Sequence, residues 1–151
     1  MESDEDALAA LTRRMAELGA RDPGSWARSE IGEGIAQQAR YLALRCIWAK
    51  ALTRWRDGST LRRVPELAQL LDQGADPDLV AAAVRVVVME AVGDVIMVID
   101  EGYDPDAPKD APGWALAETD GEGNPTGRDV GGLHESLLQL DPSGAQAADF
   151  F

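Results

Sequence analysis

The most constraining feature of the sequence is an apolar stretch that lies between Asp78 and Asp100 and reads LVAAAVRVVVMEAVGDVIMVI. The preceding Asp76 and Pro77 are typical of a helix start, because aspartate caps the first turn and proline fits the first helical position. About 21 helical residues span roughly 30 Å, whereas a single strand of that length would be far outside the usual range. The stretch therefore predicts one long helix.

Charged residues within this helix decide where it can lie. Arg85, Glu90 and Asp94 are each costly in hydrocarbon, so the helix is not expected to span a membrane. A helix that is apolar on nearly all sides in a soluble protein is expected at the centre of its domain. At about 100° per residue, Glu90, Asp94 and Glu101 share one narrow stripe, and Arg85 lies on the other side. Because isolated buried carboxylates are rare and costly, we interpret the stripe as an exposed edge or a structural ion pair rather than a buried carboxylate pair.

A second long helix is expected from Ser25 or Ser29 to about Arg56. It is apolar over most of its circumference, which makes it the natural packing partner of the first. Its densest apolar face consists of Tyr41, Leu44, Trp48, Leu52 and Trp55. Gly32 and Gly34 weaken its first turns, so they mark the place where a kink or break can form.

Two shorter helices are predicted before the central one. The first covers Glu2–Leu18, with Ser3 as its cap, and its leucines follow helical spacing. The second begins at Ser59 or Thr60 and stops at Gly74. Both offer a single apolar side, which suits helices that pack against a larger core.

The composition changes after the central helix. Gly102–Gly113 contains three prolines and is predicted to be a connector. Alternating residues and dense turn chemistry over residues 114–130 predict a β-hairpin, and Leu133–Leu140 is predicted to form a short helix. The end of the chain, Phe150 and Phe151, is expected either to dock or to fray.

The predicted fold class is mainly α, a helical bundle with two long apolar helices plus a small C-terminal β-hairpin and short helix. One domain is expected, with residues 1–100 as the helical core and residues 101–151 as an acidic C-terminal segment. The shorter segments supply little cover for two helices that are apolar on several sides. A homodimer built on the Ile35–Trp55 and Leu79–Ile99 helices is therefore expected.

Charge is distributed unevenly along the chain, whose formal net charge is −13 and whose pI is about 4.3. Met1–Ile99 holds 15 acidic and 12 basic residues, whereas Asp100–Phe151 holds 12 acidic residues against Lys109 and Arg128. Nonspecific binding to nucleic acid requires neutralisation of phosphates, so no nucleic-acid partner is expected.

A basic run contrasts with this acidity. Arg40–Arg63 holds seven basic residues and one acid, Asp57. The acidity of the C-terminal segment either serves solubility or folds that segment onto the basic run, in its own chain or a neighbour's. In the second case Trp114, Leu116 and Leu133 are expected to supply the apolar anchor, because exposed ion pairs alone are weak.

Residues that carry catalytic or metal chemistry are sparse. His134, the only histidine, is two residues from Ser136, so the two face different ways on a helix and make a poor base–nucleophile pair. Cys46 lies among apolar residues and is interpreted as a buried small hydrophobe. The oxygen-rich Asp120–Asn124 stretch lacks the glycine and the final acid of a calcium loop. No cofactor and no metal are expected. The single cysteine and the lack of a charged-then-apolar leader favour the cytoplasm.

Two classes of function follow from these features. The concentrated acidity and the lack of a catalytic constellation favour a non-catalytic acidic module that binds a basic protein partner, such as an immunity or inhibitor protein acting on a toxin or nuclease. Its expected contact residues are Tyr103, Asp104, Asp106, Asp110, Glu118, Asp120 and Glu122. The alternative is a small enzyme or ligand-binding protein with an interhelical pocket. The expected pocket residues are Arg85, Glu90, Asp94 and His134.

Overall fold

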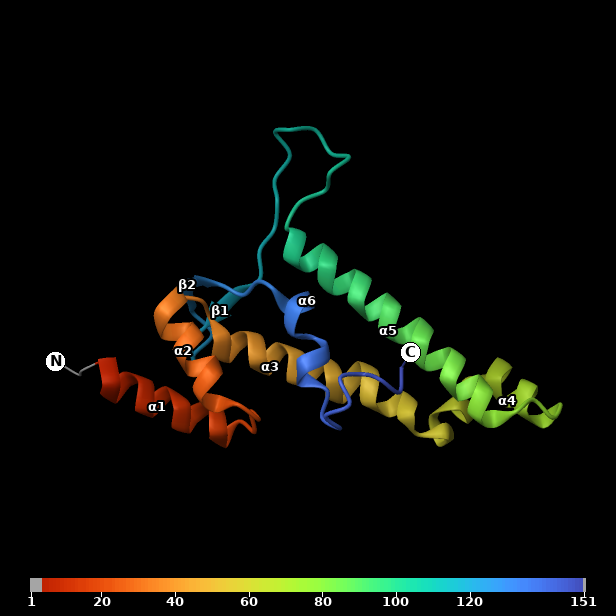
Figure 1. Cartoon of the computed structure of the whole chain (residues 1–151). Coiled ribbons are helices and arrows are strands. Elements are labelled where there is room, and N and C mark those ends of the chain that lie inside the picture. Colours follow the sequence, from red (N-terminus) through yellow and green to blue (C-terminus); the bar gives the residue numbers. More distant parts are fainter. Residues whose placement is uncertain (1–3, 151) are drawn as a thin grey trace. The chain divides into compact units, whose positions relative to one another are not determined.

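A computed structural model describes residues 4–150 of the chain (Figure 1). Within these residues the structure is mostly helical and contains a two-stranded antiparallel sheet, as the sequence predicts. The described residues divide into two compact units. The first comprises the chain up to Ala43 together with Gly102–Gly132, and the second comprises Leu44–Glu101 together with the residues from Leu133 onward.

The first unit begins with two packed helices, α1 (Asp4–Glu17) and α2 (Pro23–Glu33). The start of α2 is fixed locally, because the Asp22 carboxylate accepts a hydrogen bond from the Ser25 backbone N–H at 3.0 Å. The apolar core of this unit includes Met15, Trp26, Ala27, Ala36 and Tyr41. Ser3, the predicted cap of the first helix, lies outside the described residues.

The second long helix predicted from the sequence is not found among the described residues, where several shorter elements take its place. α2 ends at Gly34, whose φ of +71° is a left-handed conformation that favours glycine. α3 (Gln37–Ile47) then begins anew, and the Glu30 carboxylate accepts a hydrogen bond at 2.9 Å from a backbone N–H of its first turn. A π-helical turn, η1 (Trp48–Leu52), and a 3₁₀ turn, η2 (Thr53–Arg56), follow.

The predicted hairpin forms within the first unit, with strands shorter than its sequence pattern. β1 (Ala117–Thr119) pairs antiparallel with β2 (Pro125–Asp129), and the register places Ala117 opposite Asp129. The Asp120 N–H donates to the Asn124 carbonyl oxygen at 2.9 Å, which closes the turn between the strands. This turn presents its side chains to solvent.

The second unit combines helices with tight turns. Besides the end of α3, η1 and η2, it contains η3 (Gly58–Arg63), α4 (Pro65–Asp72), α5 (Pro77–Glu101), α6 (Leu133–Ser136) and η4 (Leu138–Leu140). Its core centres on Trp48, whose indole N–H donates to the Leu137 carbonyl oxygen at 2.7 Å. The Trp48 ring meets the fully buried Phe150 ring edge to face, so the end of the described chain docks. Phe151 lies outside the described residues.

α5, the green helix of Figure 1, confirms the long helix predicted from the apolar stretch. The prediction that this helix is buried at the centre of the domain is wrong. Its buried residues are Ala81, Met89 and Ile96. Its most exposed apolar side chains are Leu79 (69%), Val87 (64%), Val95 (59%) and Val98 (54%). The three buried residues are spaced seven or eight positions apart in the sequence and so lie on one side of the helix, and the opposite side is exposed to solvent. No helix among the described residues has the length and hydropathy needed to cross a membrane.

Candidate functional site

The segment between α5 and β1 forms a closed loop, here called the acidic loop (Gly102–Trp114). Its ends meet where the Trp114 N–H donates a hydrogen bond to the Gly102 carbonyl oxygen at 2.8 Å. Gly102 has a φ of +72°, and a Cβ atom there would lie 2.7 Å from the Trp114 carbonyl oxygen. A Cβ atom at Gly113 would lie 2.5 Å from the Gly102 carbonyl oxygen. The close approach of the two ends therefore requires glycine at both positions.

Turns and prolines stiffen the acidic loop between its ends. The Asp104 carbonyl oxygen accepts from the Ala107 N–H at 3.2 Å, and Asp104 Oδ1 accepts from the Asp106 N–H at 2.9 Å. A second turn is closed by the Ala111 N–H and the Pro108 carbonyl oxygen at 2.9 Å. The loop surrounds a hollow of about 220 Å³, lined by Tyr103, Asp104, Pro105, Ala107, Pro108, Lys109, Ala111 and Pro112. Compact closed loops of this kind often carry function.

The acidic loop gathers four of the predicted contact residues. Tyr103 is 60% exposed, and Asp104, Asp106 and Asp110 are exposed as well. Lys109 is the one basic residue in the loop sequence, so the loop is net negative. The structure thus places one aromatic side chain and three carboxylates on a single stiffened segment.

Glu118, which the sequence predicts as an exposed contact residue, is instead buried at 9% exposure. Its two carboxylate oxygens accept hydrogen bonds from the Arg128 guanidinium, both at 2.7 Å, and the Thr126 hydroxyl donates at 2.6 Å. Arg128 also binds the buried Glu30 carboxylate at 3.0 Å. The hydrogen bonds from Arg128 lower the pKa of Glu118, against the opposing effect of burial. Arg128 therefore anchors the hairpin to α2, because it binds Glu118 of β1 and Glu30 of α2 at once. Sequence reasoning missed Glu30, which carries no local signal.

The two remaining contact candidates, Asp120 and Glu122, lie in the exposed hairpin turn. Asp120 Oδ1 accepts hydrogen bonds from the backbone N–H groups of Asn124 and Glu122, each at 2.9 Å. These bonds, led by the one from Asn124, lower the pKa of Asp120. Its carboxylate is thus committed to shaping the turn, while Glu122 extends the exposed acidic surface.

The acidic C-terminal segment meets the basic run at Arg56, within the second unit. The guanidinium binds Asp141 at 2.9 Å and Asp149 at 2.7 Å. Burial acts to raise the pKa of the Asp141 carboxyl, but hydrogen bonds from Ala147, Ser143 and Arg56 outweigh it and lower the pKa. The hydrogen bond from Arg56 likewise lowers the pKa of Asp149. Arg56 is therefore the residue of the basic run that holds the end of the chain.

The apolar anchors expected for this docking behave differently from one another. Leu133 is buried in the second unit at 1% exposure. Trp114 and Leu116 are 43% and 40% exposed, so their predicted role as buried anchors is wrong. Trp114 instead adds an exposed aromatic surface at the base of the acidic loop. Another residue of the basic run, Arg40, donates to the Gly132 carbonyl oxygen within the first unit.

The residues of the alternative pocket on α5 do not converge. Glu90 and Asp94 lie on the exposed side of the helix. Arg85 points away from them, and its Nε donates to the Asp149 carbonyl oxygen at 2.9 Å. Neither of the two hollows described for this structure is lined by any of these residues.

The single histidine and the single cysteine occupy separate places. His134 Nδ1 lies 2.7 Å from Asp100 Oδ2, and the backbone N–H groups of His134 and Leu133 donate to the same carboxylate. Burial acts to raise the pKa of Asp100, but these hydrogen bonds outweigh it and lower the pKa. Cys46 is exposed, so its interpretation as a buried hydrophobe is wrong. His134 thus closes α6 onto the end of α5.

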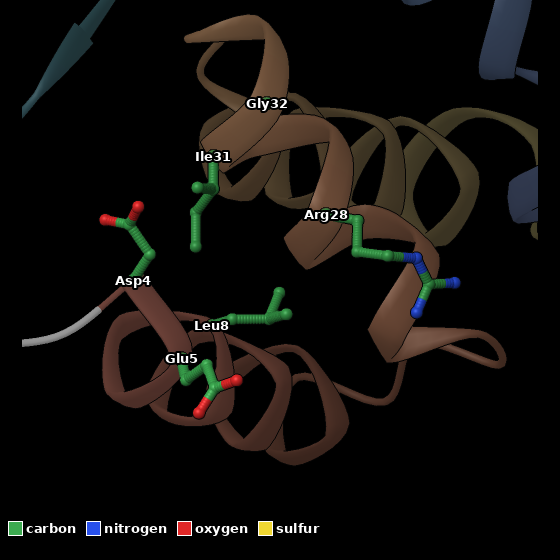
Figure 2. A pocket seen from close by; sticks show the side chains of 6 residues that line it. All are labelled: Asp4, Glu5, Leu8, Arg28, Ile31 and Gly32. Carbon is green, nitrogen blue, oxygen red and sulfur yellow. The ribbon is translucent and has the colours of Figure 1, made fainter.

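A second hollow, of about 230 Å³, lies between α1 and α2 in the first unit. Figure 2 shows Leu8 of α1 and Ile31 of α2 along it, with Asp4 and Glu5 at the start of α1. Arg28 and Gly32 complete its lining. These residues include no nucleophile and no histidine. The hollow can hold an apolar group against Leu8 and Ile31, and its charged residues are Asp4, Glu5 and Arg28.

Comparisons with known proteins do not assign the chain to a family. The chain shows no significant match to any protein-family model, curated protein or solved structure. Within residues 4–150, no group of three histidine, cysteine or acidic side chains is placed to hold a metal ion. Among the described residues, the acidic loop is the best-defined candidate site, because it holds Tyr103 and three carboxylates exposed on one closed segment.

Proposed function

We propose that the protein is a non-catalytic binding module that engages a basic protein partner through the acidic loop. The observation that carries the proposal is the closure of that loop by the Trp114–Gly102 hydrogen bond at 2.8 Å, which holds exposed carboxylates and aromatic rings in one arrangement. A loop ordered before binding loses less conformational entropy on binding. Aromatic side chains supply affinity, while carboxylates speed encounter with a cationic partner and disfavour wrong ones.

The contact surface differs from the set predicted from the sequence at two positions. Glu118 leaves the set, because its carboxylate is bound by Arg128. Trp114 joins it, because its ring is exposed at the loop base. The proposed contact residues are therefore Tyr103, Asp104, Asp106, Asp110, Trp114, Asp120 and Glu122. An immunity or inhibitor protein that blocks a basic toxin or nuclease is the kind of protein that fits this surface, and the lone cysteine fits a cytoplasmic one.

Changing Asp104, Asp106 and Asp110 together to asparagine should abolish capture of a salt-sensitive basic partner from a lysate of the source cells. The change keeps the side-chain shapes of the loop but removes the charge that attracts cations. Capture at low and moderate salt, followed by mass spectrometry, measures the loss, and circular dichroism checks the fold.

The matched control removes the same charge elsewhere, by Glu17→Gln, Glu33→Gln and Glu66→Gln. All three side chains are exposed and lie outside the acidic loop. The control should retain the partner. An unchanged partner list in the loop variant, or equal loss in both variants, would count against the acidic loop as the contact.

A homodimer, which the sequence predicts, would have to use the exposed Val87 and Val95 of α5. The other helix expected in the dimer offers less, since Leu44, Trp48 and Leu52 are buried within their own chain. Dimerisation would therefore depend on α5 alone. Glu90 and Asp94 lie on that exposed side and would repel their copies, which weighs against this arrangement.

A further inference from the structure

α5 carries an apolar face that stays exposed over most of the helix. At about 100° per residue, Leu79, Val87, Val95 and Val98 fall within one half of its circumference. From Leu79 to Val98 this face extends about 28 Å. Within this face Val87, Val95 and Val98 lie closest together, within about 80° of one another around the helix. Singly scattered apolar residues are normal on protein surfaces, but exposed apolar side chains grouped in this way favour an interaction surface.

The same side of α5 is acidic. Glu90, Asp94 and Glu101 are exposed and lie beside the apolar row. The sequence of α5 contains one basic residue, Arg85, whose Nε donates to the Asp149 carbonyl oxygen on the opposite side of the helix. The face therefore offers an apolar stripe bordered on one side by carboxylates, and the single arginine of the helix lies on the opposite side.

We propose that this face of α5 binds an amphipathic helix with lysine or arginine flanks, supplied by a partner protein. Apolar side chains at helical spacing would cover the valines, and the basic flanks would pair with Glu90, Asp94 and Glu101. This surface belongs to the second unit, whereas the acidic loop belongs to the first, so the two proposals stand or fall separately.

The charge of the face argues against other occupants. Packed helix axes lie about 8–10 Å apart, so two copies of α5 would bring their carboxylates within about one Debye length at 0.1 M salt. Neither copy would place a cation of the helix on this face to offset the repulsion, because Arg85 lies on the opposite side. A nucleic acid would add negative charge and has no apolar row to cover the valines. A basic amphipathic helix satisfies both features of the face.

The test uses the full-length protein and two synthetic peptides of roughly 18 residues, which span about 27 Å as a helix. One peptide places leucines at helical spacing with lysines along one edge of the leucine stripe, and the other has the same composition in scrambled order. In calorimetric titrations the amphipathic peptide should bind about tenfold more tightly than the scrambled one, and its affinity should fall as salt is added.

Variants then locate the binding surface. Val87→Lys combined with Val95→Lys should weaken binding of the amphipathic peptide by about tenfold or more, because it removes apolar contact and adds like charge. Leu70→Lys is the matched control, since Leu70 is 45% exposed in α4 of the same unit, and it should bind as the unchanged protein does. The acidic-loop variant should also bind normally. Circular dichroism confirms that each variant is folded.

Three results would overturn the proposal. The first is equal affinity for the amphipathic and scrambled peptides. The second is unchanged peptide binding by the Val87→Lys, Val95→Lys protein. The third is found by light scattering: the unchanged protein has the mass of a dimer, and the Val87→Lys, Val95→Lys protein has the 16.2 kDa mass of one chain. That result would assign the face to a second copy of the chain.

Discussion

Replacing Arg128 with alanine is expected to lower the free energy of unfolding by about 3 kcal/mol, because two buried carboxylates then lose their shared cation. The side chains of Glu30 and Glu118 are 8% and 11% exposed, and Arg128 binds them at 3.0 and 2.7 Å. Without Arg128, burial makes the charged forms of both carboxylates unfavourable, and the ion pairs that offset this cost are lost. Urea unfolding followed by circular dichroism measures the loss, and the hairpin should be the part of the first unit that loosens.

Two controls separate this cation from a general effect of removing charge. Arg128→Lys keeps the charge but lacks the guanidinium fork that reaches both carboxylates, so its loss should be intermediate. Arg14→Ala removes an exposed arginine that pairs with Glu17 at 3.4 Å, and it should change stability by about 0–0.5 kcal/mol. Equal stability of the Arg128→Ala and Arg14→Ala proteins would contradict this role of Arg128.

The second large effect is expected from Asp141→Ala, which should cost about 3 kcal/mol in the second unit. The Asp141 side chain is fully buried and accepts hydrogen bonds from Arg56, from Ser143 and, at 2.7 Å, from the Ala147 N–H. Ala147 has a φ of +59°, a conformation that residues other than glycine rarely adopt. The carboxylate thus holds the backbone of the C-terminal turn in place.

Loss of that turn should be visible locally as well as globally. The Arg56 guanidinium lies 5.2 Å from the Trp48 ring and 4.9 Å from the Phe150 ring, so release of the C-terminal turn would expose Trp48. Melting curves and tryptophan fluorescence measure the two effects. Asp72→Ala is the control, because its pair with Arg62 is exposed on both sides. If Asp141→Ala melted at the same temperature as Asp72→Ala, the turn would not depend on this carboxylate.

The pH dependence of stability provides a further readout of the same residue. The folded-state pKa values of Asp141 and Asp149 are lowered, so their stabilisation is present above the ordinary aspartate pKa of 3.8. It is lost as the pH falls through the folded-state values. Asp141→Asn should therefore lower stability at neutral pH and flatten the decline below about pH 4. A decline as steep as in the unchanged protein would show that other groups govern it.

The sequence predicted those elements that local chemistry decides. α5 is recognisable because its length excludes a strand and because Asp76 and Pro77 mark its start. Its exposure is not recognisable, since an apolar helix in a sequence carries no information on whether neighbouring elements cover it. Glycines in the sequence marked the break at Gly34. The start of α3 after the break also uses Glu30, whose carboxylate accepts a hydrogen bond from the first turn of α3, and the sequence does not show this contact.

The ion pairs could not be predicted from the sequence either, because they join residues that are far apart along the chain or that have several possible partners. Glu118 reads as one of several acids near a turn, and only the fold brings it to Arg128 and α2. Arg56 selects Asp141 and Asp149 from the acidic C-terminal segment across more than 80 residues of chain. The carboxylates of the acidic loop and of Glu122 are exposed, and these are the ones that the proposed contact surface uses.

Photo-crosslinking from inside the acidic loop tests directly whether this loop contacts a basic protein. A benzophenone amino acid in place of Tyr103, which is 60% exposed, should crosslink a basic protein in source-cell lysate at low salt. The same probe in place of Leu138, which is 41% exposed in the second unit, should not. The Tyr103 crosslink should also disappear when Asp104, Asp106 and Asp110 are changed to asparagine. No crosslink from Tyr103, or the same crosslinked protein from Leu138, would contradict the claim.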